Sequence, residues 1–373
     1  MTDRREVPPG ASADLVAALV PELAGVAVPE AEAPITVDQT NTSVAVADRV
    51  VVKWLYPPVP EPHRGVDLMR QLAAAGFERT PRLLGVHVVD GMVDAVITEY
   101  LPRARDGWDW YIAEAEAWAR GDDVMDPLID RAVAFGELAA EMHTALATPT
   151  AVMPEPVGRA SIEPARARGL ALLAEALVVT EGSAGEHLRV LAPRIRDEIE
   201  SFGGADEVVV QPVHGDFHAG QLLLAGDRLD VIDLDGDPVA APADRHARQP
   251  AVRDVASMVQ AIDHVGRVAD KRLDYGRSDR VDAFIAASID AALAAYRARL
   301  VALASPVVVD DRLLRPMRIV QELHELVYAA RHLPVWLYVP AAALPALFVE
   351  PSGPAGTGGS DPSTDTDDDR EVS

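Results

Sequence analysis

The chain has 373 residues, of which 49% are hydrophobic and 25% are charged, and its formal net charge is −25. So acidic a chain is not expected to bind nucleic acid, and the absence of cysteine excludes disulfide bridges and thiolate metal sites. No apolar run approaches the roughly 20 residues of a membrane helix, and the start Met1-Thr2-Asp3 lacks a basic leader. We therefore expect a cytoplasmic protein with no membrane partner. We also expect it to be a monomer or a weak dimer.

The first third of the chain predicts a cap followed by a small antiparallel sheet. The cap, residues 1–34, contains a helix over Asp14–Leu23 and a linker over Pro29–Pro34. Residues 35–101 predict a lobe of five strands and one helix. The predicted strands are Ile35–Val37, Ser43–Val46, Val50–Leu55, Val86–Val89 and Ala95–Tyr100, and the predicted helix is Val66–Ala75. The third strand should end before Pro57-Pro58, because proline donates no hydrogen bond to a ladder.

Residues 102–349 predict a second, mostly helical lobe. The periodic segments are Trp108–Ala119, Pro127–Ala147, Ala167–Thr180, His187–Phe202, Asp254–Val265, Ser278–Leu303 and Arg312–His332. Val208–Val213 and Leu229–Leu234 interrupt them and predict a short hairpin. Residues 350–373 have almost nothing to bury and predict a disordered acidic tail. The fold class is therefore α+β with two lobes.

The predicted hairpin carries the residues that point most directly to chemistry. His214-Gly215-Asp216 follows the first strand, Gln221 lies five residues beyond Asp216, and Asp233 and Asp235 follow the second strand. Magnesium prefers oxygen ligands and usually takes one or two protein carboxylates, which Asp233, Gln221 and Asp235 would supply. Asp216 would orient and deprotonate a hydroxyl acceptor, as phosphoryl transfer requires. His214 is expected to hold the loop, and His218 to face either the substrate or the surface.

Lys53 is one of only two lysines, and it lies in a predicted strand. An ammonium at such a position contacts the phosphates of ATP and is oriented by an acid on the next helix, for which Asp67 is the first candidate and Glu61 the second. Taken alone, Lys53 could equally be an ordinary exposed lysine. Together with the hairpin motif it predicts a small-molecule kinase that uses ATP and Mg²⁺.

A zinc hydrolase is the alternative chemistry. His214 and His218 with nearby carboxylates could bind a transition metal. The segment His324-Glu325-Leu326-Val327-Tyr328 begins like a zinc helix, but Tyr328 stands where the second histidine is needed. The zinc helix is therefore excluded, and the hydrolase stays the weaker alternative.

The motifs together resemble the aminoglycoside-phosphotransferase-like kinases, and within them the glucosamine kinase and maltokinase branch. The resemblance spans most of residues 35–348 and rests on further segments, which are Asp38–Ser43, Thr98–Pro102, Asp106–Asp109 and Arg253–Met258. It implies a protein-kinase-like bilobal fold in which Asp216 is the catalytic base, Gln221 and Asp233 bind magnesium and Lys53 contacts phosphate. It also implies that Thr42 and Ser43 belong to the phosphate loop and that backbone groups of Glu99 and Leu101 meet adenine.

The resemblance also implies a sugar site in the helical lobe near Asp216. Glu322 and Glu325 lie three residues apart and would flank one helix face, where their carboxylates could neutralise an ammonium, and Trp336 could stack on a pyranose ring. A solvated acidic face and a packed core tryptophan are the alternatives. An acidic pocket and a short cap favour glucosamine phosphorylated at its 6-hydroxyl. A maltokinase, an aminoglycoside phosphotransferase and a non-catalytic kinase-like binding protein remain alternatives.

Overall fold

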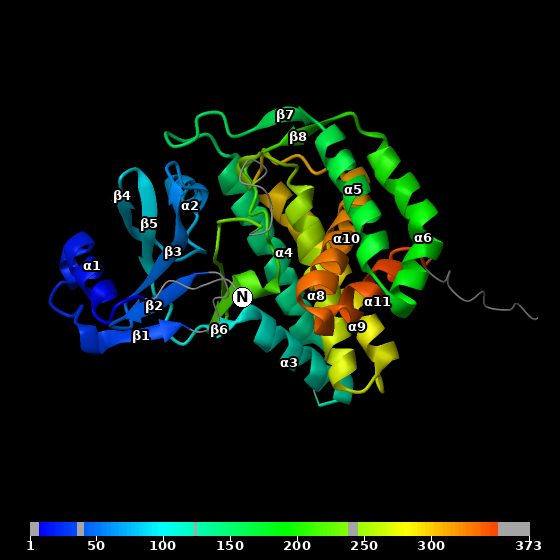
Figure 1. Ribbon diagram of the computed structural model, residues 1–373, viewed down its shortest axis with the longest axis horizontal. Coiled ribbons are helices and arrows are strands. Elements are labelled where there is room, and N and C mark those ends of the chain that lie inside the picture. The colour runs from blue at the N-terminus through cyan, green and yellow to red at the C-terminus, as the bar shows by residue number, and fades with distance from the viewer. Residues whose placement is uncertain (1–6, 36–40, 123–124, 238–244, 350–373) are drawn as a thin grey trace, which may run out of the picture.

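The N-terminal lobe is a five-stranded antiparallel sheet in the order β1-β2-β3-β5-β4 (Figure 1). The computed structural model describes residues 7–35, 41–122, 125–237 and 245–349. The elements of this lobe are α1 (Ala11–Leu19), η1 (Pro21–Leu23), η2 (Pro29–Ala31), β1 (Glu32–Ile35), β2 (Thr42–Val46), β3 (Val50–Pro60), α2 (Arg64–Ala74), β4 (Leu83–Val89) and β5 (Met92–Glu99).

Alternation along β3 decides which side of the sheet each residue faces. Val50, Val52 and Trp54 are buried in one cluster with α1, and the Trp54 indole donates to Ser12 at 2.9 Å. Because successive strand residues point to opposite faces, Lys53 projects from the other face, together with Leu55, which packs in a separate cluster. Burial of Val50, Val52 and Trp54 on one face of the sheet thus leaves Lys53 on the face that is turned toward the helical lobe.

The helical lobe contains the rest of the described chain. Its elements are β6 (Arg105–Asp106), α3 (Gly107–Arg120), α4 (Met125–Ala147), β7 (Gly158–Ser161), α5 (Glu163–Val179), α6 (Gly182–Ser201), η3 (Phe202–Gly204), β8 (Glu207–Val210), η4 (Ala219–Gln221), β9 (Leu222–Ala225), β10 (Arg228–Val231), α8 (Val252–Arg272), α9 (Ser278–Ala302), η5 (Asp311–Leu313), α10 (Leu314–His332), η6 (Pro334–Trp336) and α11 (Tyr338–Ala346). None of the helices within the described ranges is long and apolar enough to cross a bilayer.

The predicted bilobal α+β architecture is confirmed, but three local predictions are wrong. The linker ends in β1, which pairs with β2, so the last cap residues belong to the sheet. β3 continues past Pro57-Pro58 because its pairing with β5 stops at Trp54 and resumes at Val59, so the prolines occupy a register break. The predicted hairpin is split: β8 pairs with β7, whereas β10 pairs with β9.

Helix α2 belongs structurally to both lobes. It follows β3 in the chain, yet Leu68 and Leu72 are buried in the core of the helical lobe. The Gln71 amide donates to the carbonyls of Ala145 and Thr148 at 3.0 and 2.7 Å, at the end of α4. The helix therefore bridges the lobes beside the cleft. The predicted acidic tail, residues 350–373, lies outside the described residues.

Candidate active site

The loop after β8 is held by hydrogen bonds from its own histidine. His214 is fully buried, and its Nδ1 accepts from the Asp216 amide at 3.3 Å while its Nε2 contacts the Ile232 carbonyl at 2.9 Å. Burial lowers the pKa of His214, in keeping with a neutral ring that accepts at Nδ1 and donates at Nε2. Both ring nitrogens are engaged by backbone, so His214 has the predicted structural role and is not free to bind zinc.

A buried carboxylate to which the sequence pattern assigned no role, Asp254, fixes the same loop from α8. The Asp254 carboxylate accepts from the amides of His214 and Gly215 at 2.6 and 2.9 Å, and His143 Nε2 lies 3.1 Å from it. The other nitrogen of His143 lies 2.8 Å from the Tyr296 hydroxyl. Burial opposes the charge of Asp254, but the hydrogen bond and charge of His143 hold its pKa at about 2.

Asp216 projects from this loop into a polar neighbourhood. Its Oδ2 accepts from Gln221 Nε2 at 3.2 Å and lies 3.6 Å from His218 Nε2. Burial opposes the negative charge, but His218 and the Gln221 hydrogen bond hold the pKa of Asp216 well below its usual range. Asp216 is therefore ionised at neutral pH, and the structure brings together the predicted residues Asp216, His218 and Gln221.

Lys53 reaches across the cleft to the carboxylates that follow β10. Its Nζ lies 2.7 Å from Asp233 Oδ1 and 2.9 Å from Asp235 Oδ2. Burial disfavours the ammonium, but Asp235 and Asp233 together raise the pKa of Lys53 above its ordinary value. His63 Nε2 lies 3.7 Å from the other oxygen of Asp235.

The predicted partner of Lys53 is wrong. Asp67 lies on α2 but forms its ion pair with Arg70, at 3.5 Å, one turn along the same helix. The lysine is oriented by Asp233 and Asp235 instead, because the turn after β10 brings both carboxylates to it. Asp233 has a φ of +58°, and Gly236 a φ of +80°, so the strand does not continue and the chain folds back on itself.

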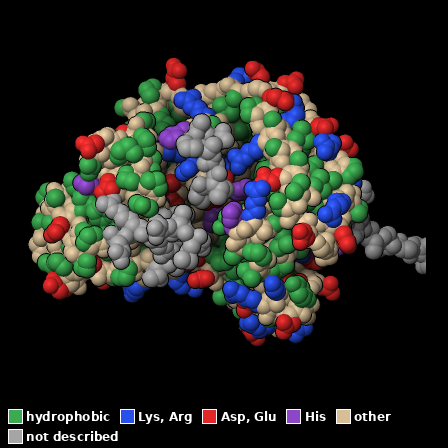
Figure 2. All heavy atoms as spheres, in the orientation of Figure 1, with side chains coloured by type: hydrophobic (Ala, Val, Ile, Leu, Met, Phe, Trp, Pro, Cys, Tyr) green, Lys and Arg blue, Asp and Glu red, His purple; other side chains and the backbone are tan. Residues whose placement is uncertain are grey.

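The donor set fits a magnesium ion. Asp233 and Asp235 already converge on a cation. Gln221 has an amide oxygen that could add a neutral ligand, since it is the amide nitrogen that donates to Asp216. The two motif loops lie side by side, because His214 Nε2 in the Asp216 loop lies 2.9 Å from the carbonyl of Ile232, the residue before Asp233. Asp216, His218, Asp233 and Lys53 therefore lie along one cleft. Figure 2 shows histidine side chains in the hollow between the lobes.

The two predicted glutamates of the sugar site have different surroundings. Glu322 is fully buried, and its Oε1 lies 2.9 Å from Nε2 of His264 on α8. Burial raises the pKa of Glu322 to about 7. The ring of His264 is desolvated too, yet Glu322 outweighs this and raises its pKa to about 9. Direct contact of Glu322 with a sugar is a wrong prediction, because its carboxylate is packed beneath His264.

For Glu325 and Trp336, contact with a sugar stays a prediction. Glu325 is partly exposed, and its charge raises the pKa of both His218 and His264. Trp336 is partly buried, with its ring 6.0 Å from that of His264 and 5.5 Å from that of Trp108. The sequence pattern assigned no role to His264, and it marked Trp108 only as part of the segment Asp106–Asp109. Both rings contact that of Trp336.

The nucleotide side of the cleft is described in part. Ser43 pairs in register with Lys53 and shares its face of the sheet, while Thr42 pairs with Trp54. Residues 38–40 of the predicted phosphate loop lie outside the described residues. The Glu99 amide donates to the Arg82 carbonyl at 2.9 Å, and its carboxylate pairs with Arg82 at 3.2 Å. Adenine contact at Glu99 and Leu101 stays a prediction.

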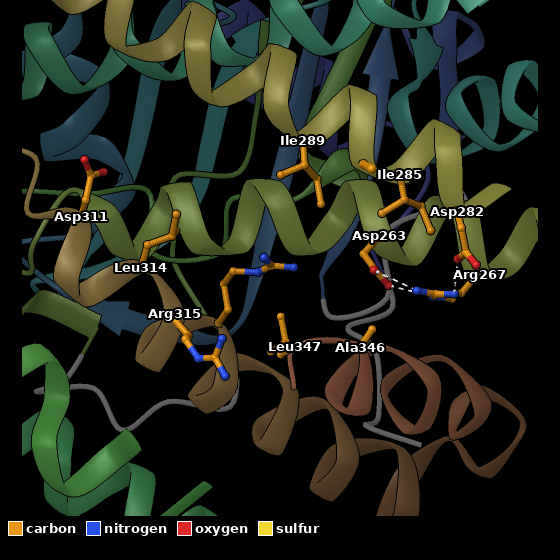
Figure 3. Close-up of a pocket in the computed structure, with 12 residues that line it drawn as sticks. Asp263, Arg267, Asp282, Ile285, Ile289, Asp311, Leu314, Arg315, Ala346 and Leu347 are labelled. Carbon is orange, nitrogen blue, oxygen red and sulfur yellow. Dashed lines mark hydrogen bonds and ion pairs between the residues drawn. The ribbon is translucent and has the colours of Figure 1, made fainter. Parts of the chain in front are cut away.

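A cavity of about 420 Å³ opens elsewhere in the helical lobe, between α8, α9 and α10 (Figure 3). Three of its charged residues pair with one another, since Arg267 lies 3.2 Å from Asp263 and 2.9 Å from Asp282. Two others pair outside the lining, Asp311 with Arg297 and Arg315 with Glu198. No predicted site residue lines it. The chemically equipped region is therefore the cleft between the lobes.

Two relatives similar to this chain over most of its length are glucosamine kinases. No protein-family model matches the chain. It is 40% identical over 329 residues to the glucosamine kinase of Streptacidiphilus jiangxiensis, which covers 86% of this chain and 74% of that protein. It is 37% identical over 324 residues to the glucosamine kinase of Mycolicibacterium smegmatis, covering 86% and 80%.

Solved structures of glucosamine kinases are also similar to this chain. A glucosamine kinase in complex with glucosamine, ADP and inorganic phosphate matches with a TM-score of 0.79 and 37% identity, over 92% of this chain and 85% of that one. A choline/ethanolamine kinase family protein from Mesorhizobium loti, 16% identical with a TM-score of 0.52, shares the fold. The resemblance read from the motifs is confirmed, and the chain belongs to the glucosamine kinase family.

Proposed function

We propose that this protein is an ATP-dependent glucosamine kinase that transfers the γ-phosphoryl group of ATP to the 6-hydroxyl of D-glucosamine. The observation that carries the proposal is the position of Asp216 in the same cleft as Lys53, Asp233 and Asp235, on a chain that belongs to the glucosamine kinase family. The O6–P bond forms as the bond from phosphorus to the β–γ bridging oxygen breaks, and ADP leaves.

Asp216 would act mainly by orientation. The low pKa keeps its carboxylate ionised, ready to accept a hydrogen bond from the acceptor hydroxyl. A weakly basic carboxylate takes the proton late, which suits a loose phosphoryl-transfer transition state with little bond formation to the acceptor. His218, 3.6 Å from Asp216, would contact the same hydroxyl or its neighbour.

The remaining charged residues would neutralise the triphosphate. Magnesium, when bound, neutralises charge that develops on the phosphate oxygens, and Asp233, Gln221 and Asp235 would hold it. The Lys53 ammonium would contact the phosphates from the sheet, on the face that it shares with Ser43. Thr42 would join the phosphate contacts, and backbone groups of Glu99 and Leu101 would meet adenine.

The acceptor side offers a carboxylate for the amino group. Glu325 is the partly exposed acid whose charge reaches both His218 and His264, so it would accept from the glucosamine ammonium. Trp336 would pack on the pyranose ring, and Glu322 would act through His264, which it orients. A carboxylate here favours an amino sugar over the neutral maltose of a maltokinase.

An acceptor panel tests the proposal. Coupled ADP release should be fastest with glucosamine, and slower with glucose, maltose and kanamycin. ADP release with maltose alone, or with kanamycin alone, would overturn the choice of acceptor. No ATP consumption with any acceptor would favour the non-catalytic binding protein.

We expect Glu325→Gln to raise the KM for glucosamine roughly 10- to 100-fold, since a hydrogen bond to a charged group is worth about 1.5–3 kcal/mol. Glucose, which has no ammonium, serves as the matched control and should show little change in KM. An equal rise in KM for both sugars would show that Glu325 does not bind the amino group.

A further inference from the structure

Arg64, the first residue of α2, reaches out of its helix into the loops of the cleft. Its Nε donates to the carbonyl of Arg245 at 2.6 Å, its Nη1 to that of Leu234 and its Nη2 to that of Val213. One guanidinium is therefore engaged with three chain segments that lie 149 to 181 residues away in sequence.

Two of these carbonyls belong to the catalytic segments. Val213 immediately precedes His214-Gly215-Asp216, and Leu234 lies between Asp233 and Asp235. A planar guanidinium carries its donors in a rigid fork, so contacts from different nitrogens fix both the distance and the relative orientation of the segments that accept them. Lysine, with a single nitrogen, cannot reproduce this.

Glycines make room for the guanidinium and for the helix that carries it. A Cβ on Gly215 would lie 3.3 Å from Arg64 Nη2, and one on Gly236 would lie 3.2 Å from Nη1; both glycines have φ near +80°. A Cβ on Gly65 would meet Asp235 Oδ1 at 2.1 Å. The start of α2 thus rests directly against the carboxylate loop.

The helix itself is anchored. Gln71, two turns along α2, donates to the carbonyls of Ala145 and Thr148, and Leu68 and Leu72 pack in the helical-lobe core. The guanidinium of Arg64 is therefore carried by a helix that is anchored to the helical lobe. A small displacement of the guanidinium would move both the Asp216 loop and the Asp233–Asp235 loop.

We infer that Arg64 is a positioning residue that sets the separation between the Asp216 loop and the Asp233–Asp235 loop. It touches neither ATP nor sugar in this role. The inference rests on the proposed function only in that the two loops are taken to perform phosphoryl transfer. Arg64 links them through backbone carbonyls, so its loss alters where the carboxylates lie and leaves the carboxylates themselves in place.

Three variants test this inference. Arg64→Gln removes the fork, Arg64→Lys keeps the charge, and Arg70→Gln is the matched control on the same helix, where Arg70 pairs only with Asp67 among the described residues. We expect Arg64→Gln to lower kcat roughly 10²-fold with the KM for glucosamine nearly unchanged, as for a misplacement of about 1 Å at a reacting centre. Arg64→Lys should lie between Arg64→Gln and the wild type, and Arg70→Gln should match the wild type.

Amide hydrogen exchange in the protein without substrate gives a second readout. Peptides covering 213–217 and 232–236 should exchange faster in Arg64→Gln than in Arg70→Gln, while peptides from α9 stay unchanged. The inference is overturned if Arg64→Gln keeps the kcat of Arg70→Gln, or if kcat falls with no difference in exchange at these loops. If Arg64→Gln fails to fold, the same comparison is made with Arg64→Lys. A wild-type protein inactive on glucosamine would refute the proposed function, whereas the exchange comparison would still test Arg64.

Discussion

We expect the Asp216→Asn variant to lose roughly 10²- to 10⁴-fold in kcat while it still binds ATP. Asparagine keeps the shape of the side chain but cannot accept the acceptor proton, and its amide can turn an N–H toward the hydroxyl that must be oriented. The proposed nucleotide contacts lie on Lys53 and the Asp233–Asp235 loop, so the affinity for ATP should change little. Steady-state kinetics with glucosamine and nucleotide titration by calorimetry measure the two quantities.

Asp227→Asn is the control for this variant. Asp227 lies exposed in the turn between β9 and β10, on the hairpin that carries Asp233 at its end, so the same change of charge is made in the same motif. Its kcat should equal that of the wild type. A fully active Asp216→Asn enzyme would remove the role given to Asp216, and a variant that no longer binds ATP would mean that the loop had collapsed.

The second large effect is expected from Asp254→Asn, on both stability and turnover. The carboxylate accepts from the amides of His214 and Gly215 and from His143. Asparagine has one acceptor oxygen, so buried donors are left unpaired, at a cost of roughly 1–3 kcal/mol for each. The loop that carries Asp216 loosens at the same time, so kcat should fall as well. Urea denaturation and steady-state kinetics check both.

The loss of stability should depend on pH in a defined direction. The folded-state pKa of Asp254 is about 2, below the roughly 3.9 of an aspartate in an unfolded chain. A lowered folded-state pKa adds stability above the unfolded value, and this is lost as the pH falls through the folded value. The difference in unfolding free energy between wild type and Asp254→Asn should thus be constant from pH 7 to pH 5 and shrink below about pH 4.

Asp290→Asn is the control, because Asp290 is exposed on α9 and the substitution is the same. A surface change of this kind usually alters stability by less than about 0.5 kcal/mol. An Asp254→Asn protein as stable as the control would show that the carboxylate is dispensable for holding the loop. A difference that grows toward low pH would contradict the sign of the pKa shift.

The residues that local sequence predicts well are those whose roles depend on short spacing. Asp216 and Gln221 lie five residues apart and meet through a hydrogen bond at 3.2 Å. Lys53 faces the cleft because strand alternation buries its neighbours Val52 and Trp54. The bilobal fold likewise follows from strands that precede a run of amphipathic helices.

The predictions for Asp67 and Glu322 are wrong because they depend on contacts between distant parts of the chain. Asp67 is close to Lys53 in sequence, yet a left-handed turn at Asp233 brings two distant carboxylates to the lysine instead. Glu322 matched the spacing of a ligand-facing acid, but helix packing turns it inward onto His264. The partner of Lys53 and the burial of Glu322 both depend on how helices, strands and turns pack against one another. The residues next to Lys53 or Glu322 in the sequence do not specify that packing.

By itself, the sequence determined the two-lobed plan, the chemistry of the cleft and the identity of its carboxylates and lysine, because periodicity and motif spacing are local properties. Only the tertiary structure decided how those groups are held: Asp254 beneath the Asp216 loop, Glu322 beneath His264, and Arg64 across both loops. These contacts join residues far apart in the chain, and 32 arginines with 59 acids offer too many possible pairs for spacing to select among them. Chain packing selects them, because a buried charge is tolerated only where partners from distant segments converge on it.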